Sequence, residues 1–404
     1  MTTCRGRVHA HVLVGIVAAF LIIGVTSPAA AYPWMIRHGY NGCTPCHADP
    51  SGGGLLTQYG RGMDGELLST KYTKSSPQED DGEPGAKIAW GAIRLPENFL
   101  MAVSYRSAYL GTKQPPDNSL KWRYIQMVTD LRAQAMFGRW RVNGSIGYVH
   151  EGARAAAITS SDKDNVVSRE HWVGYDLDED QTWLLRAGRM NLPFGIRSVE
   201  HTMMVRSSTR TDINAAQQHG AAIGYSGTDW RGELMAIAGN FQLHPDEFRE
   251  RGYSAYVEVP LASHYAVGAS SLTTYVKRDQ DLRISNFRGA HGVFARASPW
   301  EPLALLAEAD ALVQTPPHGS KRFGYAGMMQ ADLEVVQGVH FMATGELLDP
   351  GGKGSATSWA GWMTADWFFL PQAEFRVDAI RQKLAFGPTS VTANSYMGQF
   401  HLYL

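Results

Sequence analysis

Residues 304–313, ALLAEADALV, alternate apolar and polar side chains along one short run. Every second position from Leu303 to Val313 is leucine, alanine or valine, whereas Glu308, Asp310 and Gln314 occupy intervening positions. Because successive side chains of a β-strand point to opposite faces of a sheet, this stretch predicts a strand with one apolar and one polar face. The same period of two recurs through most of the chain after residue 86.

These recurrences predict the number and length of the strands. We find about 16 or 17 such segments of roughly 9 to 13 residues, the length that a tilted strand needs to cross a bilayer. Their predicted starts lie near Lys87, Asn98, Gln126, Arg139, Glu170, Gln181, His219, Trp230, Gly252, His264, Gly289, Pro302, Phe323, Gly338, Thr357, Ala373 and Thr392.

The joints between the segments alternate in length. Short joints such as FGRWR, SGTDW, VQGVH and LPQAE alternate with longer ones such as GTKQPPDNSLKW, NFQLHPDEFRERG and DPGGKGSATS. Short periplasmic turns and long outer loops are typical of outer-membrane barrels. A soluble β-sandwich also alternates, but strand length and turn alternation favour a mainly β fold, a transmembrane antiparallel barrel of about 16 strands.

The end of the chain agrees with this prediction. The final segment, SYMGQFHLYL (395–404), places aromatic and apolar side chains on one face, as expected of the last strand of an outer-membrane protein. Five tryptophans near predicted strand ends are candidates for girdles at the membrane interfaces, although each alone is equally consistent with ordinary packing. They are Trp183, Trp230, Trp300, Trp359 and Trp367.

Composition and the first residues predict where the protein resides. The 404-residue chain has a formal net charge of −1, which gives no reason to expect a nucleic-acid partner. Residues 1–31 predict a secretory signal peptide, because two arginines precede the apolar run Val12–Val25 and Ala29–Ala31 offers a cleavage site. An uncleaved anchor is the alternative, but the run is shorter than a membrane span of about 20 residues. We therefore expect the bacterial outer membrane.

One motif carries redox chemistry. Cys43-Thr-Pro-Cys46-His47 fits the C-x-x-C-H pattern for one covalent c-type haem. Cys43 and Cys46 would form thioethers to the porphyrin, and His47 would supply the proximal iron ligand. A structural disulfide, a thioredoxin-like redox pair and a zinc site are the alternatives. The first does not need His47, the second needs a βαβ pattern, and the third needs further ligands.

The second axial ligand and the domain limits follow from the neighbouring residues. Met63 or His38 is the candidate distal ligand, and Gly52–Gly54 is expected to let the backbone pass close to the haem edge. The polar run KYTKSSPQEDDGEPG predicts a linker. The expected organisation is a signal peptide (1–31), a monohaem cytochrome c-like domain (32–75), a linker (76–85) and an outer-membrane barrel (86–404).

One connection is unusually long. The stretch 191–219 carries Arg197, His201, Arg206 and Arg210. These side chains are candidates for a constriction in the barrel lumen that attracts anions or the carboxylates of a redox partner. The alternative is a solvated outer loop.

Two quoted stretches carry a family resemblance. AYPWMIRHGYNGCTPCH (31–47) followed by a barrel resembles the fused outer-membrane monohaem cytochrome c–porin family, which includes ferrous-iron-oxidising cytochromes. RAGRMNLPFGIR (186–197) is similar to a strand end of bacterial porins, and HADPSGGGLLTQYGRGM (47–63) resembles related haem–barrel proteins. The resemblance implies electron transfer between an extracellular donor or acceptor, with Fe(II) as one candidate, and periplasmic c-type cytochromes.

Two functional interpretations follow. In the first, the haem unit occupies the lumen and carries single electrons, either as a plain carrier or as an iron:cytochrome oxidoreductase. In the second, the barrel is a porin for small anionic solutes with an accessory haem domain, which lumen-facing Arg132 and Arg376 would favour. Hydrolytic catalysis is disfavoured, because the sequence shows no nucleophile, base and acid in a useful order.

Overall fold

The computed structural model describes residues 32–50, 52–71, 87–116, 118–150, 156–159, 163–198, 200, 202–241, 249–279, 282–317, 319–352, 354 and 356–404. The predicted signal peptide, the predicted linker and His201 lie outside these residues. None of the helices in the described part of the chain is long and apolar enough to span a membrane.

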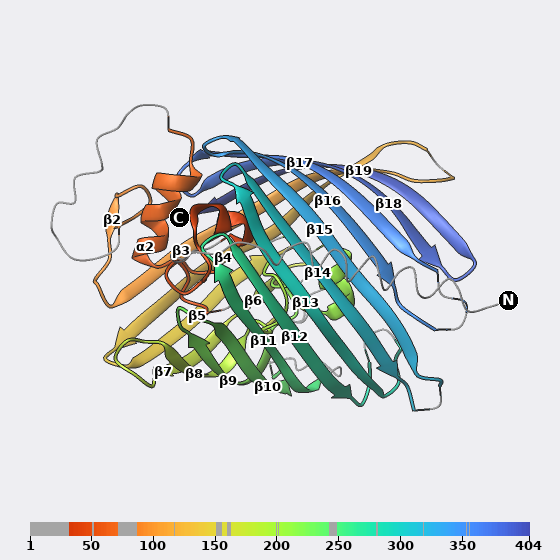
Figure 1. Ribbon diagram of the computed structural model, residues 1–404, viewed down its shortest axis with the longest axis horizontal. Helices are drawn as coiled ribbons and strands as arrows, with labels where there is room; N and C mark the ends of the chain where they lie inside the picture. Colours follow the sequence, from red (N-terminus) through yellow and green to blue (C-terminus); the bar gives the residue numbers. More distant parts are fainter. Residues whose placement is uncertain are drawn as a thin grey trace.

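Strands β3 to β19 form one closed antiparallel barrel (Figure 1). Strands β6 and β7 pair with different parts of β5 and together count as one strand of the wall. The described strands β3 to β19 therefore make a 16-stranded barrel, which confirms the predicted barrel architecture. Pairing of β19 with β3, from Asn394 with Lys113 to Tyr403 with Ser104, closes it. The strands are β3 (Phe99–Lys113), β4 (Lys121–Phe137), β5 (Trp140–Val149), β6 (Asn165–Val167), β7 (His171–Asp176), β8 (Trp183–Met190), β9 (Gln218–Ser226), β10 (Arg231–Gly239), β11 (Arg251–Ala262), β12 (Tyr265–Val276), β13 (Asn286–Trp300), β14 (Leu303–Thr315), β15 (Arg322–Val336), β16 (Val339–Asp349), β17 (Ser358–Leu370), β18 (Ala373–Phe386) and β19 (Thr389–Tyr403).

The observed strands start within five residues of the predicted positions, with one exception. The strand predicted near Lys87 is not part of the barrel. Instead, β1 (Lys87–Ile88) pairs with β2 (Ile93–Arg94) in a separate two-stranded sheet. The chain reverses between them through residues 89–91, whose φ angles are 51°, 55° and 90°. This reversal leaves too few residues for a strand that crosses a membrane.

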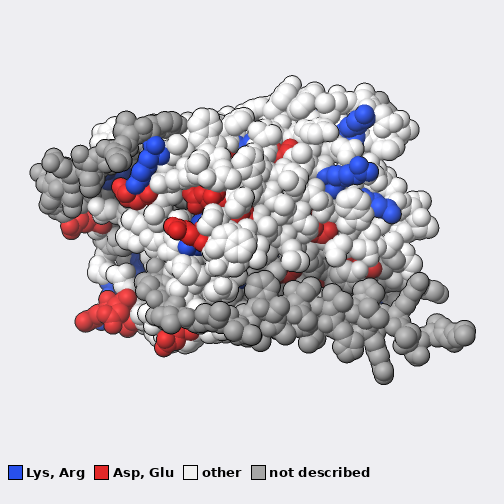
Figure 2. Space-filling view, turned by 45° about the horizontal axis from the view of Figure 1, so that its top comes forward, with Lys and Arg blue, Asp and Glu red and all other residues white. Residues whose placement is uncertain are grey.

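The barrel wall is polar inside and apolar outside. In β16, His340 and Glu346 are 0% and 3% exposed, whereas Phe341 and Leu347 on the other face are each 51% exposed. Most of the wall seen in Figure 2 is uncharged, and acidic side chains gather at the left end, where β2 lies in Figure 1. The five predicted girdle tryptophans are 37–58% exposed. An apolar outer band around a polar lumen is the arrangement of a barrel embedded in lipid.

The two ends of the barrel differ in their connections. The short turns, such as 138–139, 263–264, 301–302 and 337–338, lie at one end, and long connections such as 240–250 and 277–285 lie at the other. Short turns are periplasmic in outer-membrane barrels. One additional short turn, 387–388, joins β18 to β19 at the long-loop end.

Residues 32–71, which we call the plug, fill the periplasmic end of the lumen. They contain a 3₁₀-helix η1 (Pro33–His38), helix α2 (Gln58–Met63) and a π-helical turn η2 (Asp64–Leu68). Trp34, Met35 and Ile36 in η1 are at most 5% exposed. They pack on β-strand residues that include Phe368. Arg37 forms a fully buried salt bridge with Asp332 and donates a hydrogen bond to the carbonyl of Pro302 at 3.3 Å.

The long connection after β8 is also folded into the lumen rather than exposed as an outer loop. It contains helix α3 (Met204–Thr209), which lies in the middle of the barrel in Figure 1. Its backbone is bound to the wall: the N–H of Ile196 donates to Glu308 at 2.7 Å and that of Met204 donates to Glu346 at 2.6 Å. We call this connection, residues 191–217, the inner loop. Carboxylates of the wall thus satisfy backbone donors of the inner loop, which fixes its position.

Candidate functional site

The Cys43–His47 segment forms a single tight turn inside the plug. The N–H groups of Cys46 and His47 both donate to the carbonyl of Cys43, at 3.1 and 2.9 Å. Both cysteines are buried free thiols, so the structural-disulfide alternative does not describe this structure. A Cβ atom at Gly52 would lie 2.9 Å from the Cys43 sulfur, which leaves room there only for glycine.

His47 lines a cavity of about 140 Å³. The lining comes from the plug, the barrel wall and the inner loop. The plug contributes His47, Gly52–Gly54, Gly60, Arg61 and Asp64; the wall contributes Ala102, Ser104, Arg106, Val128, Arg132, His401 and Tyr403; the inner loop contributes Arg197, Ser198, Ile213 and Asn214. The predicted glycine run thus faces the same cavity as the predicted proximal ligand.

Arg61 stands out among the cations around this cavity. Arg106 and Arg132 on the wall are neutralised, by Glu200 at 3.1 Å and by Asp130 at 3.2 Å, respectively. Arg61 is 7% exposed and donates to the carbonyl of Met101 at 2.6 Å, but its Nε and Nη1 groups have no hydrogen-bond partner in the described chain. Burial lowers the pKa of Arg61. A carboxylate in the cavity would supply the missing acceptors.

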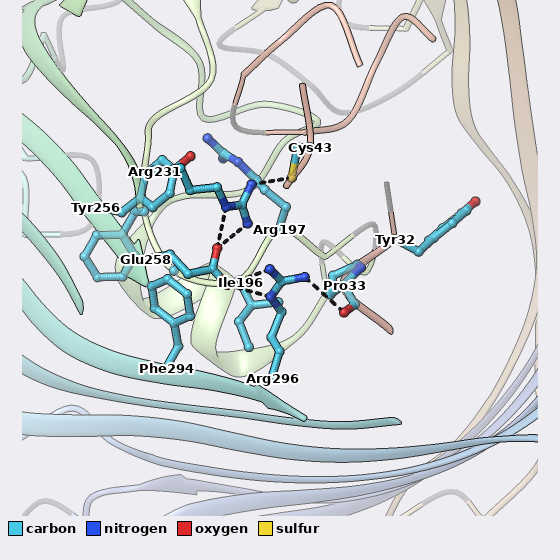
Figure 3. A pocket seen from close by; sticks show the side chains of 12 residues that line it. Tyr32, Pro33, Cys43, Ile196, Arg197, Arg231, Tyr256, Glu258, Phe294 and Arg296 are labelled. Atoms are coloured by element: carbon cyan, nitrogen blue, oxygen red, sulfur yellow. Dashed lines mark hydrogen bonds and ion pairs between the residues drawn. The ribbon is translucent and has the colours of Figure 1, made fainter. Parts of the chain in front are cut away.

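A second, smaller pocket lies beside Cys43 (Figure 3). Arg231 of β10 donates to the Cys43 sulfur at 2.9 Å and to Glu258 of β11 at 2.6 Å. Arg296 of β13 donates to the same Glu258 at 2.7 Å and to the carbonyl of Asn41 at 2.7 Å. Two wall arginines that share one glutamate therefore hold the segment just before the Cys43–His47 turn.

The structure places the two predicted distal ligands away from the cavity that His47 lines. The sulfur of Met63 accepts a hydrogen bond from Tyr40 at 3.0 Å, and His38 lies 3.6 Å from Glu334. Neither is among the described residues that line the cavity. His401 does line it, and its Nδ1 lies 3.0 Å from Glu374. The sequence pattern gave no signal for His401, because it occupies a polar position of an ordinary strand.

The predicted constriction arginines that the structure describes all lie inside the barrel. Arg197 lines both pockets. Arg206 is 2% exposed and forms a salt bridge with Glu308. Arg210 contacts Glu250 at 2.8 Å and Asp279 at 2.9 Å. Carboxylates therefore compensate the charge of the last two, and these arginines serve to anchor the inner loop.

Asp64 makes the stability of the plug depend on pH. It lines the cavity and accepts a hydrogen bond from Tyr403 at 2.8 Å, and burial raises its pKa from 3.8 to about 7. Below about pH 4 the carboxyl is neutral in the folded and the unfolded chain. Between about pH 4 and 7 only the unfolded chain ionises, so the opening free energy of the plug falls as the pH rises, by on the order of 4 kcal/mol.

Hydrogen exchange of amides in residues 58–68 at pH 5 and pH 8, corrected for intrinsic rates, measures this change. Asp64→Asn is expected to abolish most of it. A variant that keeps the full pH dependence would show that another group causes it.

Comparison with known proteins supports the architecture alone. No protein-family model and no curated protein matches the sequence. Among solved structures, a loop-deletion mutant of the outer-membrane protein OmpT of Vibrio cholerae has a TM-score of 0.59 at 9% identity, over 76% of this chain and 100% of that chain. The outer-membrane channel DcaP of Acinetobacter baumannii has 0.57 at 13% identity, over 80% and 100%.

A third structure extends the same likeness. The anion-selective porin of Comamonas acidovorans has a TM-score of 0.56 at 10% identity, over 76% of this chain and 99% of that chain. The chain has the porin fold. With its apolar outer band and polar lumen, this porin barrel belongs in the bacterial outer membrane. The described plug that carries Cys43, Cys46 and His47 lies inside it, in addition to the inner loop.

Proposed function

We propose that the protein is an outer-membrane electron-transfer protein in which one covalent c-type haem sits in the lumen of a porin barrel. The observation that carries the proposal is the position of the C-x-x-C-H turn: it lies inside the barrel, and His47 lines a cavity enclosed by the plug, the wall and the inner loop. A barrel wall has no redox centre of its own, so the plug is the part of the chain that supports electron transfer.

The residue types and spacing of the C-x-x-C-H turn fit this group. Cys43 and Cys46 would hold it through thioethers, His47 would bind its iron, and Arg61 would pair with a propionate. The bound haem would supply a one-electron redox couple. The protein residues would position the haem and shield it from water. Arg231 and Arg296 hold the segment that leads into the motif, and the plug and the inner loop restrict access of water.

The orientation suggests the partners. Because the plug lies at the end with short turns, the haem would be accessible to a periplasmic c-type cytochrome. The other redox partner would be an extracellular donor or acceptor, with ferrous iron as the first candidate substrate. Acidic side chains near the plug end (Figure 2) would favour a basic periplasmic partner.

The test uses the complete protein, produced in cells that mature c-type cytochromes. Pigment that stays with the polypeptide on a denaturing gel, at one haem per chain, would support the cofactor assignment. Holoprotein in liposomes should then reduce cytochrome c trapped inside when ferrous iron is added outside. Fully loaded protein that transfers no electrons to either carrier would refute the electron-transfer role while leaving the haem site intact.

Arg61 gives a quantitative prediction for the haem environment. Arg61→Gln is expected to lower the midpoint potential by on the order of tens of millivolts, because a nearby positive charge disfavours the more positive ferric state. Arg61→Lys should retain most of the wild-type potential, and Arg123→Gln, at the far end of the barrel, should leave it unchanged. Spectroelectrochemical titration measures all three. Equal potentials in wild type and Arg61→Gln would contradict the pairing.

The second candidate function is a pore for small anionic solutes with an accessory haem unit. The pocket beside Cys43 favours it, because Arg197, Arg231 and Arg296 surround a single carboxylate there, that of Glu258. Wall residues Arg132 and Arg376 carry less weight, since each is paired with a carboxylate. Conductance measurements separate the two functions, as described in the Discussion.

A further inference from the structure

Three basic side chains project from the outer surface of the barrel near its extracellular end. Lys113 of β3 pairs with Asn394, which pairs with Arg381 of β18. Lys383, two residues further along β18, pairs with Trp359. Directly paired residues of neighbouring strands point to the same face, so the three cations and Trp359 share one face.

That face is the one that contacts lipid. Val377 lies on the Arg381 face of β18 and is 46% exposed, and Tyr396 lies on the Asn394 face of β19 and is 47% exposed. On the face drawn in Figure 2, basic side chains gather at the end far from the plug. Within the described residues, no salt bridge involves Lys113, Arg381 or Lys383.

The height of the cluster on the wall matches a membrane interface. Phe375, Val377 and Ala379 precede Arg381 on the outward face of β18. The eight residue steps from Phe375 to Lys383 span about 26 Å of strand, which is about 20 Å along the membrane normal at a strand tilt of about 40°. Because the apolar band of outer-membrane barrels is about 25 Å tall, the long basic side chains reach its outer edge. The exposed rings of Tyr109 and Trp122 stack on each other, with centroids 5.1 Å apart, on the same outward face of the wall.

We propose that Lys113, Arg381 and Lys383 form a binding site for the phosphate groups of the glycolipid that makes up the outer leaflet of bacterial outer membranes. Unpaired cations at the edge of an apolar band are complementary to an anionic lipid headgroup, and the aromatic side chains beside them contact its acyl chains. The site is independent of the haem.

The test compares binding of purified lipopolysaccharide to the full-length protein and its variants in neutral detergent. The triple variant Lys113→Gln, Arg381→Gln, Lys383→Gln is expected to bind about 100-fold more weakly than wild type. The matched control is Arg123→Gln, Lys277→Gln, Arg322→Gln, which removes the same charge from the same end but not from this lipid-facing cluster, and it should bind normally. Unchanged heat-modifiable gel mobility establishes that each variant is folded.

Three outcomes would overturn the proposal. The first is wild-type affinity in the triple variant. The second is an equal loss in the control, which would indicate non-specific attraction to a basic rim. The third is equal binding of dephosphorylated lipopolysaccharide and the intact molecule by wild type, which would exclude the phosphates as ligands.

Discussion

Replacing both Cys43 and Cys46 with alanine is expected to remove all pigment that survives denaturing electrophoresis, while the barrel still assembles. The two sulfurs are the only attachment points after residue 31, since the sequence beyond that position contains no other cysteine. Each single variant should retain one thioether and some covalent haem. Haem staining of the gel, alongside heat-modifiable mobility of the barrel, measures both results. Covalent pigment in the double variant would contradict the assignment.

The burial of the thiols adds a second expectation to this experiment. Cys46 is 1% exposed, and burial raises the pKa of its thiol to about 12. At neutral pH the thiol is therefore protonated and shielded, and it reacts slowly. Haem added to the already folded apoprotein should give no covalent product, whereas haem supplied during export should. His47→Met is the matched control: it keeps both sulfurs and should alter the absorption spectrum rather than the covalent link.

Removing the plug is expected to open the barrel. Deletion of residues 32–84 should raise single-channel conductance in a planar bilayer by about tenfold or more, because a 16-stranded barrel without a plug encloses an aqueous channel. The inner loop would still narrow the middle of the lumen through its Arg206–Glu308 salt bridge. The full-length protein should show only small currents. A high conductance of the full-length protein with marked anion preference would instead favour the solute-pore function.

A full-length variant tests the same idea without deletion. Arg37→Glu places a third carboxylate beside Asp332 and Glu334 in a buried site, and loss of one partner of a buried pair typically costs about 3–5 kcal/mol. Frequent transitions to the high-conductance level are therefore expected. Lys71→Glu, in an exposed part of the plug, should leave the current unchanged. Identical low currents in Arg37→Glu and wild type would show that Arg37 does not hold the plug in place.

The barrel was predictable because its signal is local. Alternation within each strand and the lengths of the joints are properties of short segments, and they located strands such as β14 and β18 within a few residues. Lys87 misled the prediction because a short apolar run can end in a reversal as readily as in a strand. The haem motif was equally local, since five consecutive residues carry it.

The surroundings of the motif could not be predicted in this way. The contact between Arg231 and Cys43 joins residues 188 positions apart, and no pattern near either residue indicates it. No pattern in the sequence around Arg61 indicates that the wall buries it. The long connection after β8 had two interpretations because its arginines suit either water or carboxylates, and only the partners on the wall decided between them.

The hydrogen bond from Tyr403 to Asp64 joins the last strand of the barrel to the plug. Tyr403 also belongs to the seam, where β19 meets β3. Asp64 of the plug therefore gains its hydrogen bond from Tyr403 only after β19 has formed. Docking of the plug is therefore coupled to closure of the barrel, so that a prematurely terminated chain would lose both the closed barrel and the docked plug.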